Sequence, residues 1–407
     1  MRITPNFAET AVKFAAGGRE RIVRIRQTLV TRVAATCAAV VVMTGMSVSA
    51  TDAFAYEACE TPQFGAAAVA VDERAETAEQ AQTNGMRRAT DLAFRRVLMR
   101  LLRSEEATTA FIEANSPDRF VDFFHIASEN TIAGRYIATL DYCFSAATLR
   151  DAFRDAGLLW AELRSPRILV LPVWLAPDGA RAWQPDNAWL AGWRDTVSEA
   201  DGLVDFTLLE PTILNERSLR AADLAIADQR VLRRAATVAG ADQIMLVTAR
   251  LDYRGSQLIL AVDGQLFTAT AEQLTVLGKM VDTPVNDNLE MQLDLARKSI
   301  LTELESGWHA ANTIRGGQTQ EITVVVPVAS LSQWVERLEA FDSLAVIDSY
   351  LIRSLNVRGG VVTLRLVGDA AAFENGLSAR RLRLRQREDG TNAVSYTHLT
   401  LPTIYSV

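Results

Sequence analysis

The chain has few of the side chains that most often do chemistry. Its 407 residues include three histidines and three cysteines. Before the last fourteen residues only His125 and His309 occur, far apart in the sequence. A zinc site usually needs three or four Cys, His or carboxylate ligands, often with two close together, and the sequence contains neither H-E-x-x-H nor C-x-x-C. We therefore predict no metal site and interpret both histidines as structural.

Motifs that bind phosphate or carry a nucleophile are also missing. No G-x-S-x-G elbow accompanies either histidine. "QLTVLGKM" has Gln273 and Met280 where a Walker motif requires Gly and Ser or Thr. Three nearby acidic residues lack the defined separation of a glycosidase pair and are interpreted as solvated surface: Asp201, Asp205 and Glu210. The sequence predicts no cofactor and disfavours an enzyme, with a hydrolase site assembled across domains as the weakest alternative.

The chain beyond the N-terminal segment lacks an excess of positive charge. Residues 1–55 carry seven basic and three acidic side chains, so the rest of the chain has a net charge of −11 against −7 for the whole. Non-specific nucleic-acid binding depends on a cationic face. We therefore exclude nucleic acid as a partner.

No run in the chain is both long and strongly apolar. The most apolar stretch is "AATCAAVVVMTGMSVSATDAFA" (34–55), which follows five arginines and contains Thr, Ser and Gly. It ends in the A-x-A sequence of residues 53–55, which places the expected cut between Ala55 and Tyr56. A membrane helix needs about 20 strongly apolar residues, whereas this pattern is typical of a secretory signal. We expect residues 1–55 to be removed and the protein to be periplasmic. The alternatives are a second cut site after Val48-Ser49-Ala50 and an uncleaved inner-membrane anchor facing the periplasm, the one case that would involve a membrane.

Removal of residues 1–55 would leave two cysteines, Cys59 and Cys143. An even number in an exported chain favours a disulfide, which an oxidising compartment would preserve. Two separate buried thiols are the alternative.

Residues 59–160 are predicted to form a small α+β domain. The strand "QFGAAAVAVD" (63–72) ends at Asp72, which we expect to cap the long helix that follows. "RYIATLDYCF" (135–144) alternates as a half-buried strand, and Ser145 caps a short helix closed by Gly157. Small and apolar side chains recur along the long helix at three- and four-residue steps, so this face should pack closely on a sheet: Ala78, Ala81, Gly85, Ala89, Ala93, Val97 and Leu101.

Residues 166–313 are predicted to form an α/β domain. "RILVLPVW" (167–174) is a continuous apolar run, as expected of a central strand covered on both faces. We expect the following elements after it: a Trp-bearing helix at 186–200, a strand at "LVDFTLLEPT" (203–212), a helix capped by Asp228, a hairpin turning near Gly255 and a closing helix at about 287–313.

Residues 321–390 follow the order strand, helix, strand, strand, helix, strand, which predicts a ferredoxin-like βαββαβ domain. The last fourteen residues, "VSYTHLTLPTIYSV" (394–407), carry no charge and resemble translated sequencing-adapter read-through. We interpret them as a non-native tail, with an ordinary frayed terminus as the alternative.

Two groups of residues are candidates for binding. Four tryptophans lie within twenty residues and could stack on sugar rings, anchor a protein interface or belong to the core: Trp174, Trp183, Trp189 and Trp193. Three arginines alternate with leucines in the last predicted strand and form either a solvated edge or a docking patch for an anionic partner: Arg381, Arg383 and Arg385.

Two segments, "VAVDERAETAEQAQTNGMRRATDLAFRRVLMRLL" and "FFHIASENTIAGRYIATLDYCFSAATLRDAFRDAGL", resemble a proteobacterial exported family, domain of unknown function number two thousand and sixty-six. The resemblance covers most of residues 64–385. It implies export but no catalytic residue, because the family's function is unassigned.

The middle domain, through "RILVLPVW" and "LAIADQRVLRRAATVAGADQIMLVTARL", resembles the α/β domain of the Tol-system propeller protein and of the curli-secretion channel family. Members of that group act in the Gram-negative cell envelope by protein–protein contact. The resulting hypothesis is a non-enzymatic periplasmic protein that binds an unidentified envelope protein. The alternative is a glycan- or peptidoglycan-binding module that uses the tryptophans.

Overall fold

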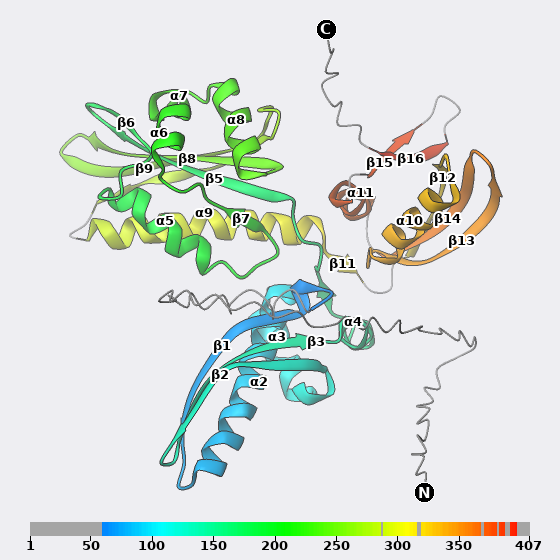
Figure 1. Ribbon diagram of the computed structural model, residues 1–407. Helices are drawn as coiled ribbons and strands as arrows, with labels where there is room; N and C mark the ends of the chain where they lie inside the picture. The colour runs from blue at the N-terminus through cyan, green and yellow to red at the C-terminus, as the bar shows by residue number, and fades with distance from the viewer. Residues whose placement is uncertain are drawn as a thin grey trace, which may run out of the picture. The chain divides into compact units, whose positions relative to one another are not determined.

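The structure is a computed structural model that describes residues 59–285, 288–315, 319–367, 370–380, 382–386 and 391–396. All of them belong to one compact unit, residues 51–407. Within the described residues the chain has a mixed α+β fold with several sheets, as predicted (Figure 1). The predicted cleavage site at Ala55 and Tyr56 lies outside the described residues, as do Arg381 and residues 397–407.

The first sheet is antiparallel, with its strands in the order β1-β3-β2. Two helices lie between β1 and β2 in the sequence, and a third follows β3. The elements are β1 (Gly65–Arg74), α2 (Ala78–Leu102), α3 (Glu105–Ala114), β2 (Val121–Ile132), β3 (Arg135–Phe144) and α4 (Ala146–Asp155). The small-residue stripe of α2 is buried from Ala81 onward. At Gly85 an added Cβ would lie 2.5 Å from the ring of Tyr136 on β3, so the absence of a side chain there allows the helix to approach the sheet closely.

Asp72 does not cap the long helix as predicted. β1 continues to Arg74, because its pairing with β3 extends to Arg74 opposite Arg135. The cap is Thr77, whose side chain accepts a hydrogen bond from the N–H of Gln80. Asp72 remains in the strand and accepts a hydrogen bond from Arg135 Nε at 2.7 Å.

A disulfide joins Cys59 and Cys143, as the cysteine count predicted, with 5.6 Å between the two Cα atoms. Cys143 lies on β3 opposite Gly65, and Cys59 precedes β1. The bond therefore fastens the start of this domain to the middle strand of its sheet.

The middle sheet has the order β10-β9-β8-β5-β6, with β7 also beside β5. Its strands are β5 (Arg167–Ala176), β6 (Gly179–Arg181), β7 (Asp205–Thr207), β8 (Gln243–Arg254), β9 (Gln257–Thr268) and β10 (Gln273–Pro284). Its helices are α5 (Ala188–Ser198), α6 (Ile213–Ser218), α7 (Ala221–Ala225), α8 (Gln229–Ala239) and α9 (Leu289–Ala311). The β8–β9 hairpin turns at Gly255, which has a φ of +65°.

Helices cover both faces of this sheet (Figure 1). On one face Ile168 and Val170 of β5 pack with α5 and α9. On the other face Leu169, Leu171 and Val173 pack with α7 and α8. This double cover explains the continuous apolar run of β5, which has to be apolar at every position.

The strand predicted at residues 203–212 is much shorter than expected. Only Asp205–Thr207 pair with β5, and Leu208 and Leu209 leave the sheet. Two short strands outside the large sheets also pair, β4 (Leu159–Trp160) with β11 (Ile314–Arg315).

The C-terminal sheet has the order β13-β14-β12-β16-β15. Its elements are β12 (Thr319–Pro327), α10 (Leu331–Asp342), β13 (Ile347–Asn356), β14 (Gly359–Val367), α11 (Ala370–Ala379), β15 (Leu382–Gln386) and β16 (Asn392–Tyr396). The first six follow the predicted βαββαβ order. Both helices contribute to a single core with β12 and β14.

β16 was not predicted. It lies between β12 and β15, parallel to the first and antiparallel to the second. Ala393 and Val394 are buried, and Val394 belongs to the domain core. Residues 394–396, assigned above to a non-native tail, are therefore part of the sheet, which extends past the predicted limit at residue 390.

Candidate functional site

The middle sheet has an open stretch along one edge of β5. β7 pairs with residues 167–169 of β5, and β6 pairs with residues 174–176. Among the described residues no strand pairs with positions 170–173 on that side. Pro172 lies in this gap, and proline suits it because proline has no N–H that would be left unpaired.

An apolar pocket of about 510 Å³ lies along this gap. Its floor includes Val170, Leu171 and Pro172 of β5. Its walls come from α5, from the segment that follows β7 and from the residues after β6; they include Leu190, Trp193, Val197, Phe206, Leu208 and Trp183. The volume is within the range of ordinary ligand pockets, and we refer to this feature as the β5 pocket.

The N-terminal cap of α5 fixes the wall that this helix contributes. The side chain of Asn187 accepts hydrogen bonds from the N–H groups of Trp189 and Leu190. From that start, Leu190, Trp193 and Val197 recur at three- and four-residue steps and line the pocket. A cap and a helical repeat therefore set the shape of this wall.

A buried arginine supports α5 from behind. Arg297 of α9 donates from Nη1 to the carbonyl oxygen of Ala188 at 3.1 Å and lies over the ring of Trp189. An added Cβ at Gly192 would lie 2.3 Å from Arg297 Cζ. Burial lowers the pKa of Arg297, and the neighbouring Asp294 acts in the opposite direction. The guanidinium thus holds α5 against α9, and Arg297 is not among the residues that line the pocket.

The charged groups at the β5 pocket pair with one another. Arg194 and Glu210 form an exposed ion pair at 2.6 Å, and both residues line the pocket. Trp183 donates from its ring N–H to the carbonyl oxygen of Leu219 at 2.9 Å, which fixes the indole. The pocket therefore offers apolar surface with a polar rim, which suits binding of an apolar group.

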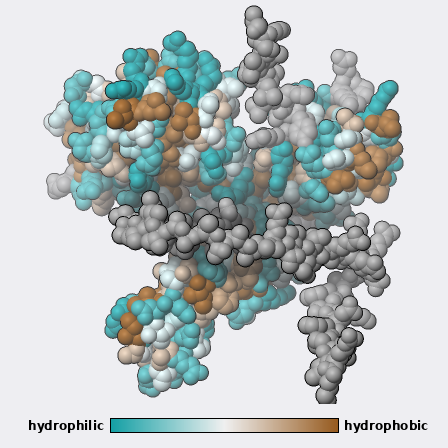
Figure 2. Space-filling view, viewed as in Figure 1, coloured by the Kyte–Doolittle hydropathy of each residue, from teal (hydrophilic) through white to brown (hydrophobic). Residues whose placement is uncertain are grey.

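Exposed aliphatic side chains lie close in sequence to the pocket lining. Ile213 and Leu214 of α6 follow Pro211, a lining residue, and are 69% and 74% exposed. Ile226, two residues after the lining residue Leu224, is 75% exposed. Figure 2 shows hydrophobic colour over the surface where Figure 1 places α6. Apolar exposure of this kind is typical of contact surfaces.

The tryptophan cluster does not form a single exposed surface. Trp189 and Trp193 are fully buried and meet edge to face at 5.3 Å, so neither can stack on a sugar ring. Burial favours the core alternative for Trp189 and Trp193, which four-residue spacing had left open because it gives a shared face without saying whether that face is covered. Trp174 and Trp183 are half-buried, and Trp183 contributes to the pocket wall.

The predicted arginine patch belongs to a different sheet. Arg383 and Arg385 lie on β15 and are exposed. β15 is an edge strand, so the solvated-edge interpretation fits their positions. The docking alternative for these arginines stays a prediction.

The two histidines occupy unlike environments. His309 of α9 is buried, with Nε2 2.7 Å from the carbonyl oxygen of Leu101, and burial lowers its pKa. His125 is on β2 with Nδ1 3.6 Å from a carboxylate oxygen of Asp141. In the described part of the chain, no group of three or more His, Cys, Asp or Glu side chains is arranged to hold a metal ion.

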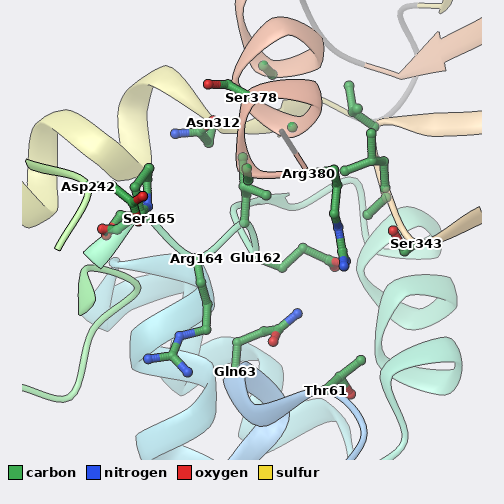
Figure 3. A pocket seen from close by; sticks show the side chains of 18 of the residues that line it. Thr61, Gln63, Glu162, Arg164, Ser165, Asp242, Asn312, Ser343, Ser378 and Arg380 are labelled. Atoms are coloured by element: carbon green, nitrogen blue, oxygen red, sulfur yellow. The ribbon is translucent and has the colours of Figure 1, made fainter. Parts of the chain in front are cut away.

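A larger and more polar hollow of about 1220 Å³ is drawn in Figure 3. Its lining includes Glu162, Arg164, Asp242, Asn312 and Arg380. Glu162 is already bound by Arg150, which donates to both carboxylate oxygens, and by the ring N–H of Trp160. The most buried acidic group of this hollow is thus occupied by structural contacts, which makes the β5 pocket the better candidate.

Of the walls of the β5 pocket, the sequence analysis named Trp183 and Trp193 and missed the other residues. Leu208 and Leu209 were assigned to a strand, and Pro172 to an uninterrupted one. The proline was the available signal, because a proline within a central apolar strand indicates an edge that lacks a partner.

Comparisons with known proteins give little further guidance. No family model matches the chain, and no curated protein matches it. Among solved structures, the lipoprotein GNA1162 from Neisseria meningitidis aligns over 35% of this chain and 99% of its own length, at 14% identity and a TM-score of 0.23. In the described residues, no helix has the length and apolar character needed to cross a membrane.

Proposed function

We propose that this chain acts in the periplasm without catalysis, by binding another envelope protein through the β5 pocket. The observation that carries the proposal is the apolar pocket itself, whose charged lining residues, Arg194 and Glu210, pair with each other at the rim. An apolar pocket with a polar rim suits a large apolar anchor side chain, the kind of residue that dominates protein interfaces.

Export is supported by two independent features. The N-terminal 55 residues have the basic, apolar and A-x-A pattern of a secretory signal. The Cys59–Cys143 disulfide suits an oxidising compartment. The resemblance to the exported family of unknown function agrees with both.

An envelope protein is the preferred partner because the middle domain resembles modules that work in the envelope by protein contact. A glycan is less well supported, since two of the four tryptophans considered for stacking are buried. The exposed Ile213 and Leu214 would extend the apolar contact beyond the pocket.

The test is site-specific photo-crosslinking in cells, with the photoreactive residue at Ala191 or at Ala188. Both are exposed positions of α5, and only Ala191 lines the pocket. We expect one dominant crosslinked envelope protein from position 191 that is absent from position 188. Equal crosslinking at the two positions, or none at 191, would contradict the proposal.

A binding measurement with the crosslinked protein then tests the pocket directly. Ala191→Trp should fill the pocket mouth and weaken binding at least tenfold, about 1.4 kcal/mol. The matched variant Ala188→Trp adds the same side chain on the same helix and should change affinity less than twofold. If both variants bind like the wild type, the partner uses another surface.

A further inference from the structure

The C-terminal sheet ends in an exposed apolar edge strand. Every residue of β13 is at least partly exposed. Leu351, Ile352 and Leu355 are 54%, 41% and 51% exposed, and Val357 at the hairpin tip is 93% exposed. Figure 1 shows β13 at the outer edge of its sheet, and Figure 2 shows hydrophobic colour over the same place.

The outer edge of β13 has no strand beside it among the described residues. The strand spans ten residues and contains neither Pro nor Lys, the residues that most often protect an edge from pairing. Between its two register shifts, its backbone groups on that side are placed to pair with another extended chain.

The two charged residues of β13 are placed for pairing with a copy of itself. Asp348 is near the start of the strand and Arg353 in its second half. Each lies where the pairing of β13 with β14 shifts register: Asp348 between residues 347 and 349, and Arg353 between residues 352 and 354. In an antiparallel pair formed by two copies, the start of one strand meets the end of the other, so each Asp348 approaches the second copy's Arg353.

Both side chains lie on the same face of the sheet. Asp348 is 3.7 Å from Arg365 of β14, and Arg353 donates from Nε to Thr363 Oγ1 of β14 at 3.1 Å. Arg365 and Thr363 are two residues apart on one strand and share a face. Cross-strand charge pairs of this kind favour pairing, whereas like charges oppose it.

A second edge strand shows that exposure alone is not sufficient. β2 spans twelve residues at the edge of the N-terminal sheet and exposes Phe123 and Phe124. It carries Asp122 near its start and Glu129 in its second half. Antiparallel pairing of two β2 strands would bring these carboxylates toward each other, so the charge pattern favours β13 and not β2.

We propose that β13 pairs antiparallel with β13 of a second copy of this chain, joining two C-terminal sheets around a two-fold axis. The Asp348–Arg353 contacts set the direction of pairing, and Leu351 and Ile352 supply apolar cross-strand contacts. The register shifts interrupt the ladder twice and keep the pair short, so we expect reversible, concentration-dependent association.

The test uses the full chain and two complementary variants in sedimentation equilibrium. Arg353→Glu leaves two acidic residues on the strand, and Asp348→Arg leaves two basic ones. Each variant alone should dimerise at least tenfold more weakly than the wild type. Mixed in equal amounts, they should associate with nearly wild-type strength, because each acidic strand then meets a basic one.

Rescue by mixing separates pairing from folding, since a misfolded variant would not recover when a second variant is added. The matched control on β2, the double variant Asp122→Arg with Glu129→Arg, keeps like charges on that strand and should leave self-association unchanged. A wild-type chain that stays monomeric, single variants that dimerise normally, or a mixture that remains monomeric would each overturn the proposal.

Discussion

Two strands of equal length, β5 and β13, show how differently this chain uses its sheets. Each spans ten residues. Helices cover β5 on both faces, and Ile168 to Leu171 are buried in unbroken succession. β13 lies at an edge and has no buried residue. The comparison teaches that β5 is buried between two layers of helices and shapes a pocket, while β13 leaves most of its side chains exposed at the edge of its sheet.

The largest difference in stability should come from introducing an aspartate into β5 and, separately, into β13. Val170→Asp would bury a carboxylate without a partner in the middle sheet and should lower the free energy of unfolding by at least about 4 kcal/mol. Leu351→Asp on β13 should change it by no more than about 0.5 kcal/mol. Chemical denaturation of both variants measures the difference. Similar losses of stability in the two variants would contradict the difference in burial between β5 and β13.

A third sheet sharpens the comparison. In the N-terminal domain α2 covers one face of the sheet, and the Cys59–Cys143 disulfide reinforces it. Replacing both cysteines by Ser should cost about 2–5 kcal/mol, mainly because the unfolded chain gains freedom. Thermal unfolding with and without reductant provides the check. The wild type in reductant should match the double variant, and a variant as stable as the oxidised wild type would contradict the argument.

Two glycine substitutions test the support behind the β5 pocket. Gly192→Ala in α5 should lose about 1–2 kcal/mol of stability, because the new methyl group would displace the buried guanidinium of Arg297. Gly307→Ala in α9 meets no atom within 4 Å and should gain about 0.5–1 kcal/mol from helix propensity. Denaturation curves of the pair would show opposite signs. A gain at Gly192 would mean that Arg297 moves away freely.

The smallest expected effect concerns pH. Burial lowers the pKa of His309 in the folded chain, and the neighbouring Arg103 also lowers it. The unfolded chain therefore binds a proton first as the pH falls, so the folded state loses stability below the usual histidine pKa of about 6.5. His309→Gln can still donate to the Leu101 carbonyl and should show a smaller loss between pH 7 and pH 5. An identical loss in variant and wild type would assign the dependence to other groups.

Much of the fold could be predicted from local pattern. The apolar run of β5 indicated a strand covered on both faces, and the small residues of α2 indicated close packing on a sheet. β2 gave no such signal, because a strand exposed along both faces shows no alternation of apolar and polar residues.

The candidate site was harder to predict because its features depend on tertiary contacts. Leu208 and Leu209 have the composition of a strand, and only the end of β7 at Thr207 makes them pocket wall. Trp189 and Trp193 share a helix face, but α9 and its Arg297 decide that this face is covered. Self-pairing at β13 likewise depends on which strand forms the edge, and the sequence pattern did not reveal that position.

The position of β16 has a consequence for the order in which the chain can fold. Its neighbour β12 is separated from it in sequence by α10, β13, β14, α11 and β15. During synthesis β12 is therefore complete well before β16. Until residues 392–396 are available, one side of β12 has no partner in the sheet. Long-range pairings of this kind form late. A nascent chain would therefore pass through an interval in which the centre of its C-terminal sheet is open to strands from other molecules.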